Sequence, residues 1–220
     1  DADELYVPGP FRYMHGSWSF DSKWIAYTKI TETQFKRVYL YSTEQKKSFA
    51  LTDGLSDASD PKFDKSGKYL YFFASTDAGP VINWFDQSNA DMRSTNSIYL
   101  VTLQKETISP FAKENDEEAI KPDTAAGKPA DKKVTPDKKE EQLRIDWDGI
   151  ENRIVDLPIA ADNYGQLGAG KEGEIYYVVY PASGQGSGML HKYDLKARKD
   201  AEVTAMDGYI ISADGKKMLY

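Results

Sequence analysis

Residues 61–73 read Pro-Lys-Phe-Asp-Lys-Ser-Gly-Lys-Tyr-Leu-Tyr-Phe-Phe, and this stretch decides the fold. An apolar segment ends at Phe63, a polar turn follows, and an aromatic, strand-prone run begins at Tyr69. Asp and Ser side chains form local turn hydrogen bonds, and Gly67 can adopt a positive φ because it has no Cβ. The stretch therefore predicts a β-hairpin.

The chain repeats this hairpin pattern four times. Aligned on their last tyrosine, the copies end at Tyr27, Tyr71, Tyr177 and Tyr220, and the first copy has the shorter turn. The intervals are 44, 106 and 43 residues, and a period in the low forties is typical of β-propeller blades. We therefore predict an all-β fold, a β-propeller with an incomplete ring of about three blades plus the start of a fourth. The long interval then carries about 63 extra residues as insertions.

The strand-like runs give approximate blade boundaries. We expect blade one at 11–52, opening with an inner strand at 18–20, blade two at 59–158 with insertions at 75–96 and 112–142, blade three at 163–205, and the start of blade four at 208–220. The segment 113–142 has almost no large apolar side chain and contains three prolines, so we expect it to be disordered. Because the chain stops inside a hairpin, we also expect a fragment of a longer protein.

Composition excludes several classes of function. The net charge of −7 and the isoelectric point near 5.0 argue against a protein that binds the nucleic-acid backbone. The absence of cysteine excludes disulfides and thiolate catalysis. No apolar run approaches the length of a membrane span. The compartment stays open, because an exported and a cytoplasmic protein are both compatible with this composition.

Two motifs suggest ligand chemistry, but their contexts do not support it. Gly168–Gly173 matches the dinucleotide pattern G-x-G-x-x-G, yet a strand-like run follows where a helix is required, so we interpret it as a glycine-rich blade turn. Asp146 and Asp148 resemble the start of a calcium loop, but its twelfth position would be Val155, which cannot ligate calcium. We expect no cofactor and no metal.

Catalytic chemistry has equally little support. The chain has only two histidines and no Gly-x-Ser-x-Gly elbow. We interpret His191 as ordinary surface, and we expect no catalytic residue in this chain.

The central channel of the ring is the remaining candidate site, because the entries to inner strands line it. The candidate rim residues are His15, Ser17, Ser59 and Asp60. Ser59 and Asp60 are equally compatible with a role as turn formers. A second candidate is the long loop that holds Trp84 and Phe85, which we expect to cover a surface or a partner because both side chains are costly to leave in water.

Residues 145–158, with the pattern Ile-Asp-x-x-Gly-Ile-x-x-Arg-Ile-Val-x-Leu-Pro, resemble one propeller region of tricorn-type proteases. As in relatives of that family, a Ser-Pro-Phe segment (109–111) and a charged insertion precede the pattern, and a short blade opening (163–167) follows it. The unit at 18–27 also fits, although TolB-like and dipeptidyl-peptidase-like propellers share it. The resemblance covers most of the chain.

This resemblance implies a large serine peptidase of the S41 type. In that family the propellers precede a PDZ-like module and the catalytic domains, and they filter or channel peptides. No position here matches the family's catalytic motifs. The implied partners are the remaining blades, the downstream PDZ-like and protease domains, and peptides. Open blade faces also predict self-association of the fragment.

Two alternatives stay open. One is a TolB-like protein-binding propeller without enzymatic activity. The other is the N-terminal propeller of a prolyl-oligopeptidase-type hydrolase.

Overall fold

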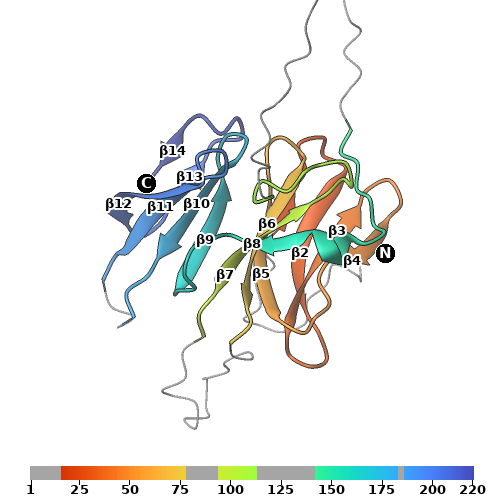
Figure 1. Cartoon of the computed structure of the whole chain (residues 1–220), viewed down its shortest axis with the longest axis horizontal. Coiled ribbons are helices and arrows are strands. Elements are labelled where there is room, and N and C mark those ends of the chain that lie inside the picture. The colour runs from red at the N-terminus through yellow and green to blue at the C-terminus, as the bar shows by residue number, and fades with distance from the viewer. Residues whose placement is uncertain (1–15, 78–93, 113–141, 183–185) are drawn as a thin grey trace, which may run out of the picture.

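The computed structural model describes residues 16–77, 94–112, 142–182 and 186–220. Three four-stranded antiparallel sheets and a two-stranded hairpin stand side by side around one axis, and the ring they begin is not closed (Figure 1). This confirms the predicted all-β propeller with an incomplete ring. Three predictions fall on residues outside the described ranges: the rim residue His15, the loop residues Trp84 and Phe85, and the disorder of the second insertion.

Each sheet pairs strands in chain order, and we call the sheets blade one to blade three. Blade one consists of β1 (Gly16–Trp18), β2 (Trp24–Ile30), β3 (Lys36–Ser42) and β4 (Lys47–Ala50). Blade two consists of β5 (Asp57–Phe63), β6 (Tyr69–Ser75), β7 (Ser97–Thr102) and β8 (Ile154–Asp156), with the 3₁₀ helix η3 (Ile150–Arg153) before β8. Blade three consists of β9 (Tyr164–Ala169), β10 (Glu174–Val179), β11 (Gly188–Asp194) and β12 (Lys199–Met206), and the last hairpin pairs β13 (Ile210–Ile211) with β14 (Met218–Leu219). In the described part of the chain, no helix is long and apolar enough to cross a membrane.

The core lies between the blades. Strand β6 shows why, because its successive side chains point to opposite faces. Leu70 and Phe72 pack toward blade one, whereas Tyr71 and Phe73 pack toward blade three. All four are almost fully buried, so blade two is held by apolar contact with its neighbours on both faces.

In blade one and in the last hairpin, the turn between the first two strands is closed by the same side-chain hydrogen bond. Ser19 Oγ donates to Asp21 Oδ1 at 2.6 Å, and Ser212 Oγ donates to Asp214 Oδ1 at the same distance. The predicted inner strand at 18–20 is therefore wrong: β1 ends at Trp18, because Ser19 already belongs to this turn.

The fourth residue of this turn has a left-handed backbone in all four copies. The φ angles are 58° at Ser22, 69° at Gly67, 73° at Gly173 and 68° at Gly215. Three of the four positions are glycine, which adopts this conformation without a Cβ clash. The positive φ predicted for Gly67 is confirmed.

The predicted alignment of the copies on their tyrosines is wrong by one residue in blade two. Backbone hydrogen bonds close the turns Ser19–Trp24 and Asp64–Tyr69 over equal lengths, so the first turn is not the shorter one. Tyr71 packs against the following blade, whereas Tyr177 packs against the preceding one. Because a shift of one residue moves a side chain to the other face of a strand, the counterpart of Tyr177 is Phe72.

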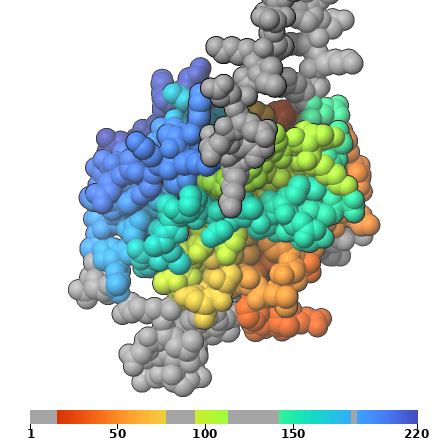
Figure 2. Space-filling model, viewed as in Figure 1, coloured from red at the N-terminus to blue at the C-terminus, as the bar shows by residue number. Residues whose placement is uncertain are grey.

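We call residues 143–158 the return segment, because they lead the chain from the second insertion back to blade two and contain the pattern that resembles tricorn proteases. Figure 2 shows this segment as a turquoise band across one face. Its Arg153 side chain donates to the backbone carbonyls of Thr102 (3.0 Å), Asp148 (3.0 Å) and Asp146. One planar guanidinium group thus joins the end of β7 to the turn before β8. Through these hydrogen bonds the return segment stabilises the position of β8, the outer strand of blade two.

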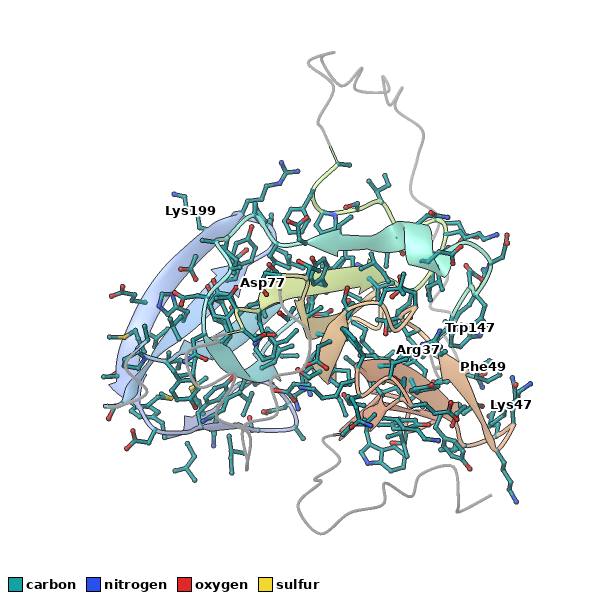
Figure 3. The ribbon with its side chains drawn as sticks, turned by 90° about the horizontal axis from the view of Figure 1, so that it is seen from below. Arg37, Lys47, Phe49, Asp77, Trp147 and Lys199 are labelled. Atoms are coloured by element: carbon teal, nitrogen blue, oxygen red, sulfur yellow. The ribbon has the colours of Figure 1, made fainter. Side chains whose placement is uncertain are left out.

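The same segment packs against blade one. Trp147 stacks on Phe49 of β4 with ring centroids 4.7 Å apart, and it lies 6.0 Å from the Trp24 ring (Figure 3). The Lys47 ammonium lies 5.4 Å from the Phe49 ring centroid. These contacts add aromatic packing between the return segment and the outer strand of blade one.

Candidate functional site: a cleft along the inner strands

A cleft of about 340 Å³ runs beside the innermost strands of all three blades and the last hairpin. Its polar lining includes Ser17, Asp60, Lys62, Lys65 and Gln166. Its apolar lining includes Trp18, which is 59% exposed, and Ile210, which is 70% exposed. Because inner strands border the axis of a propeller, this cleft is the described part of the central channel.

Asp60 lies at a bulge in β5, between the paired residues Ser59 and Lys62. Its φ of 50° is left-handed, which is uncommon for a residue other than glycine. The bulge turns its carboxylate toward blade three, where Oδ2 accepts the backbone N–H of Leu167 at 2.8 Å. The Lys62 ammonium lies 2.9 Å from Oδ1, and both side chains are mostly buried. Asp60 therefore connects two blades at the wall of the cleft.

Gln166 occupies the matching position in blade three, four residues before the first residue of its turn, as Asp60 does before Asp64. Its φ is 51°. Its side-chain amide donates to the Asp207 carbonyl at 2.9 Å, in the link to the last hairpin. The inner strands thus use one repeated bulge to contact the next blade.

Tyr209 also lines the cleft. Its hydroxyl donates to the Gln166 carbonyl at 2.5 Å, and burial raises the pKa of this hydroxyl well above its usual value. A Cβ on Gly168 would lie only 2.6 Å from the same hydroxyl, so glycine is required for this approach. Tyr209 therefore stays neutral and fixed at physiological pH.

The predicted rim residues have different positions. Ser17 lines the cleft, and its Oγ accepts the backbone N–H of Phe63 at 3.2 Å. Asp60 also lines the cleft, whereas Ser59 pairs with Phe73 and is not among the lining residues. Neither Ser59 nor Asp60 lies in a turn, because both are within β5. A role for these residues in binding stays a prediction.

Three further lining residues, Lys62, Gln166 and Tyr209, were not predicted from the sequence. The available signal was the position in the repeat: each lies within six residues before the first residue of a hairpin turn, as the predicted Asp60 does.

His191 is not the ordinary surface residue that the sequence suggested. Its side chain is only 15% exposed, and Nδ1 lies 2.8 Å from Asp200 Oδ2. The other Asp200 oxygen accepts the hydroxyl of Tyr177 at 2.7 Å, and the Tyr177 and His191 rings stack 5.4 Å apart. The group ties β10, β11 and β12 together and lies away from the cleft residues.

Acidic side chains in the turns also connect blades. Asp64 is buried and accepts the Tyr71 hydroxyl at 2.7 Å and the Gly173 N–H at 2.9 Å. Asp21 accepts the N–H of Leu143 at 2.8 Å. Burial acts to raise the pKa of Asp21, but hydrogen bonds from Ser19 and from backbone N–H groups outweigh burial and lower it.

The roots of both blade-two insertions are anchored by hydrogen bonds. At the first, Asp77 accepts hydroxyls from Ser75 (2.6 Å) and Thr95 (2.5 Å), and these bonds lower the Asp77 pKa to about 2 (Figure 3). At the second, Arg198 of blade three donates to the carbonyls of Pro110 and Ala112, each at 3.1 Å. The residue after that insertion, Leu143, is anchored to blade one through Asp21.

The two ligand-like motifs have structural roles. The stretch Gly168–Gly173 forms the end of β9 and the turn into β10, which confirms the interpretation as a blade turn. Asp146 accepts hydrogen bonds from Lys105 and Arg144, and Asp148 pairs with Lys105. In the residues that the structure describes, no group of three or more His, Cys, Asp or Glu side chains is placed to hold a metal ion.

Several proteins are similar to this chain. The Tricorn protease homolog 1 of Streptomyces coelicolor is 26% identical over 92% of this chain and 19% of its own length, and the Tricorn protease homolog of Saccharolobus solfataricus is 27% identical over 92% of this chain and 17% of its own length. The chain thus spans about a fifth of these curated relatives. Among solved structures, the tricorn protease superposes with a TM-score of 0.60 at 21% identity, covering 93% of this chain and 19% of that one.

A putative TolB from Agrobacterium tumefaciens superposes with a TM-score of 0.51 at 12% identity, over 90% of this chain and 51% of that one. These structural likenesses establish the propeller fold. The family is established by sequence, because the model of the Tricorn protease second beta propeller domain matches residues 11–220. The chain therefore belongs to the family of second β-propeller domains of tricorn proteases.

Proposed function

We propose that this chain is a non-catalytic propeller segment of a tricorn-like serine peptidase and that its central cleft contributes to the access and filtering of peptide substrates. The observation that carries the proposal is the cleft itself, which the inner strands of every described blade border. A volume of about 340 Å³ lies in the usual range of ligand-binding sites.

The lining of the cleft suits a peptide that passes through it. Trp18 and Ile210 offer apolar contact, while the Ser17 hydroxyl and the Lys62 ammonium offer hydrogen-bond donors. A mixed lining of this kind contacts both the side chains and the backbone of an extended peptide without a dedicated pocket for one residue.

Domain scaffolding is the second part of the proposed role. Continuous apolar clusters join blade one to blade two and blade two to blade three, and a smaller cluster joins blade three to the last hairpin. Such packing gives a rigid body on which the further domains of a longer chain can be positioned.

The experiment uses the absence of cysteine. Ile210→Cys introduces a single thiol in the cleft, and Val203→Cys introduces one on the exposed outer strand β12. Each is labelled with a bulky maleimide, and binding of a fluorescein-labelled decapeptide of alternating Leu and Gln is followed by fluorescence anisotropy. We expect the label at position 210 to reduce peptide affinity at least about tenfold by occupying the cleft, and the label at 203 to leave it unchanged. Equal affinity in both labelled proteins would contradict a role of the cleft in peptide contact.

We further propose that the isolated chain self-associates through its open ends. The last hairpin exposes Ile210, Leu219 and Tyr220, and blade one exposes Trp18. Such apolar surface lowers its free energy by pairing with another copy. We expect the molar mass from light scattering to rise with concentration and to fall back toward one chain in Ile210→Ser/Leu219→Ser. A molar mass of one chain at all concentrations would refute this expectation.

A further inference from the structure

We infer that the central cleft selects acidic peptide segments, in which a carboxylate side chain lies beside an apolar one. The inference rests on the proposed function, because it names the class of peptide that the same cleft would take. It is carried by the charges and hydrogen-bond donors that line the cleft.

The only acidic residue among the described lining residues is Asp60, and its carboxylate is already engaged. Oδ1 pairs with Lys62, and Oδ2 accepts the backbone N–H of Leu167. Asp60 therefore has little capacity to bind a cation in the cleft.

The basic residues that line the cleft can still bind an anionic group. An ammonium group has three N–H donors, and Lys62 directs one of them to Asp60 while its side chain stays 24% exposed. Lys65 is exposed in the turn between β5 and β6, and among the described residues no carboxylate pairs with it. Two lysines against one engaged aspartate make the cleft locally positive on a chain whose net charge is −7.

Ser17 adds a further hydrogen-bond donor to the lining of the cleft. Ser17 Oγ accepts the Phe63 N–H, which leaves its hydroxyl hydrogen free to donate. The Gln166 amide and the Tyr209 hydroxyl are engaged with backbone carbonyls. A carboxylate accepts hydrogen bonds only, so it is the peptide group that matches these free donors.

Apolar surface accompanies the charge. Trp18 and Ile210 line the same cleft and are among the most exposed large apolar side chains of the described residues. An extended peptide that alternates acidic and apolar side chains would therefore use both kinds of surface.

The test compares three fluorescein-labelled decapeptides in which Leu alternates with Glu, Gln or Lys. We expect the Glu peptide to bind the wild-type chain about fivefold more tightly than the Gln peptide, and the Lys peptide to bind most weakly. The preference should shrink as salt is added, because solvent-exposed charges are screened.

A variant that reverses one charge in the lining of the cleft tests the role of the lysines. Lys65→Glu should abolish or invert the preference for the Glu peptide over the Gln peptide. Lys199→Glu, on the exposed outer strand β12 (Figure 3), makes the same change in net charge away from the cleft and should keep the preference.

The outcomes separate the two proposals. If all three peptides bind equally well and the maleimide at position 210 still blocks them, the acidic preference is wrong and the peptide-access role stands. If none of the peptides binds, the peptide-access role fails and the preference fails with it. If Lys199→Glu removes the preference as strongly as Lys65→Glu, the effect belongs to net charge and the inference is overturned.

Discussion

Replacing Gly67 with alanine is expected to lower the free energy of unfolding by about 2–3 kcal/mol. The φ of 69° at this turn residue is left-handed, where a Cβ is strained. A Cβ here would also lie 2.3 Å from Cε1 of Phe20 in blade one and 3.2 Å from Cδ1 of Leu143 in the return segment. The alanine would therefore strain the turn and push apart two contacts that join blades one and two.

Ser22→Ala is the matched control, because Ser22 has the same place in the turn of blade one, a φ of 58°, and already carries a Cβ. Thermal unfolding followed by circular dichroism should show a drop of about 5–10 °C for Gly67→Ala and almost none for Ser22→Ala. Similar midpoints for both variants would mean that Phe20 moves aside freely and that the close contact has no energetic role.

Replacing Arg153 with lysine is expected to destabilise the chain by about 2–3 kcal/mol, although the charge is kept. The donors of a lysine ammonium all lie on one compact atom, whereas the wide, planar guanidinium group of Arg153 reaches three carbonyls on two segments. We expect the turn before β8 to detach from the end of β7 first at Asp146, whose N–H donates to the Leu103 carbonyl at 2.9 Å. Hydrogen exchange at this amide reports that detachment.

Arg144→Lys serves as its control in the same segment. Arg144 is exposed and pairs with Asp146 and Glu106 only through ion pairs in water, so its replacement should leave the stability almost unchanged. If Arg153→Lys left both the unfolding midpoint and the hydrogen exchange of Asp146 as in the wild type, the hydrogen bonds of Arg153 would not be what stabilises the return segment.

Much of the fold follows from local patterns. The Asp-Lys-Ser-Gly turn at 64–67 has the predicted left-handed glycine, and strand periodicity identifies which runs form sheets. The facing of each side chain is harder to predict. Tyr71 looked equivalent to Tyr177, but Tyr71 faces the next blade and Tyr177 the preceding one, because strand register depends on where each turn closes.

The cleft could be predicted only in part. Ser17 and Asp60 were identified by their place before an inner strand. The role of Asp60 as a link to Leu167 depends on a bulge and on a neighbour 107 positions away in sequence, and no local pattern encodes such a partner. Lys62 and Gln166 become recognisable only when the repeats are compared by position instead of by residue type.

The anchoring of the second insertion has a consequence for how this family can vary. Where the chain leaves blade two, Arg198 of blade three donates hydrogen bonds to its backbone carbonyls. Where the chain returns, Asp21 of blade one accepts a hydrogen bond from its backbone. Both sets of hydrogen bonds act on backbone groups at the two ends of the insertion, so they do not depend on which residues lie between those ends. The entropic cost of a longer connection grows only logarithmically with its length, by about 0.6 kcal/mol per doubling. The propeller thus has an insertion site at which whole segments can be exchanged during evolution, or by grafting, while the blades keep their sequence and their packing.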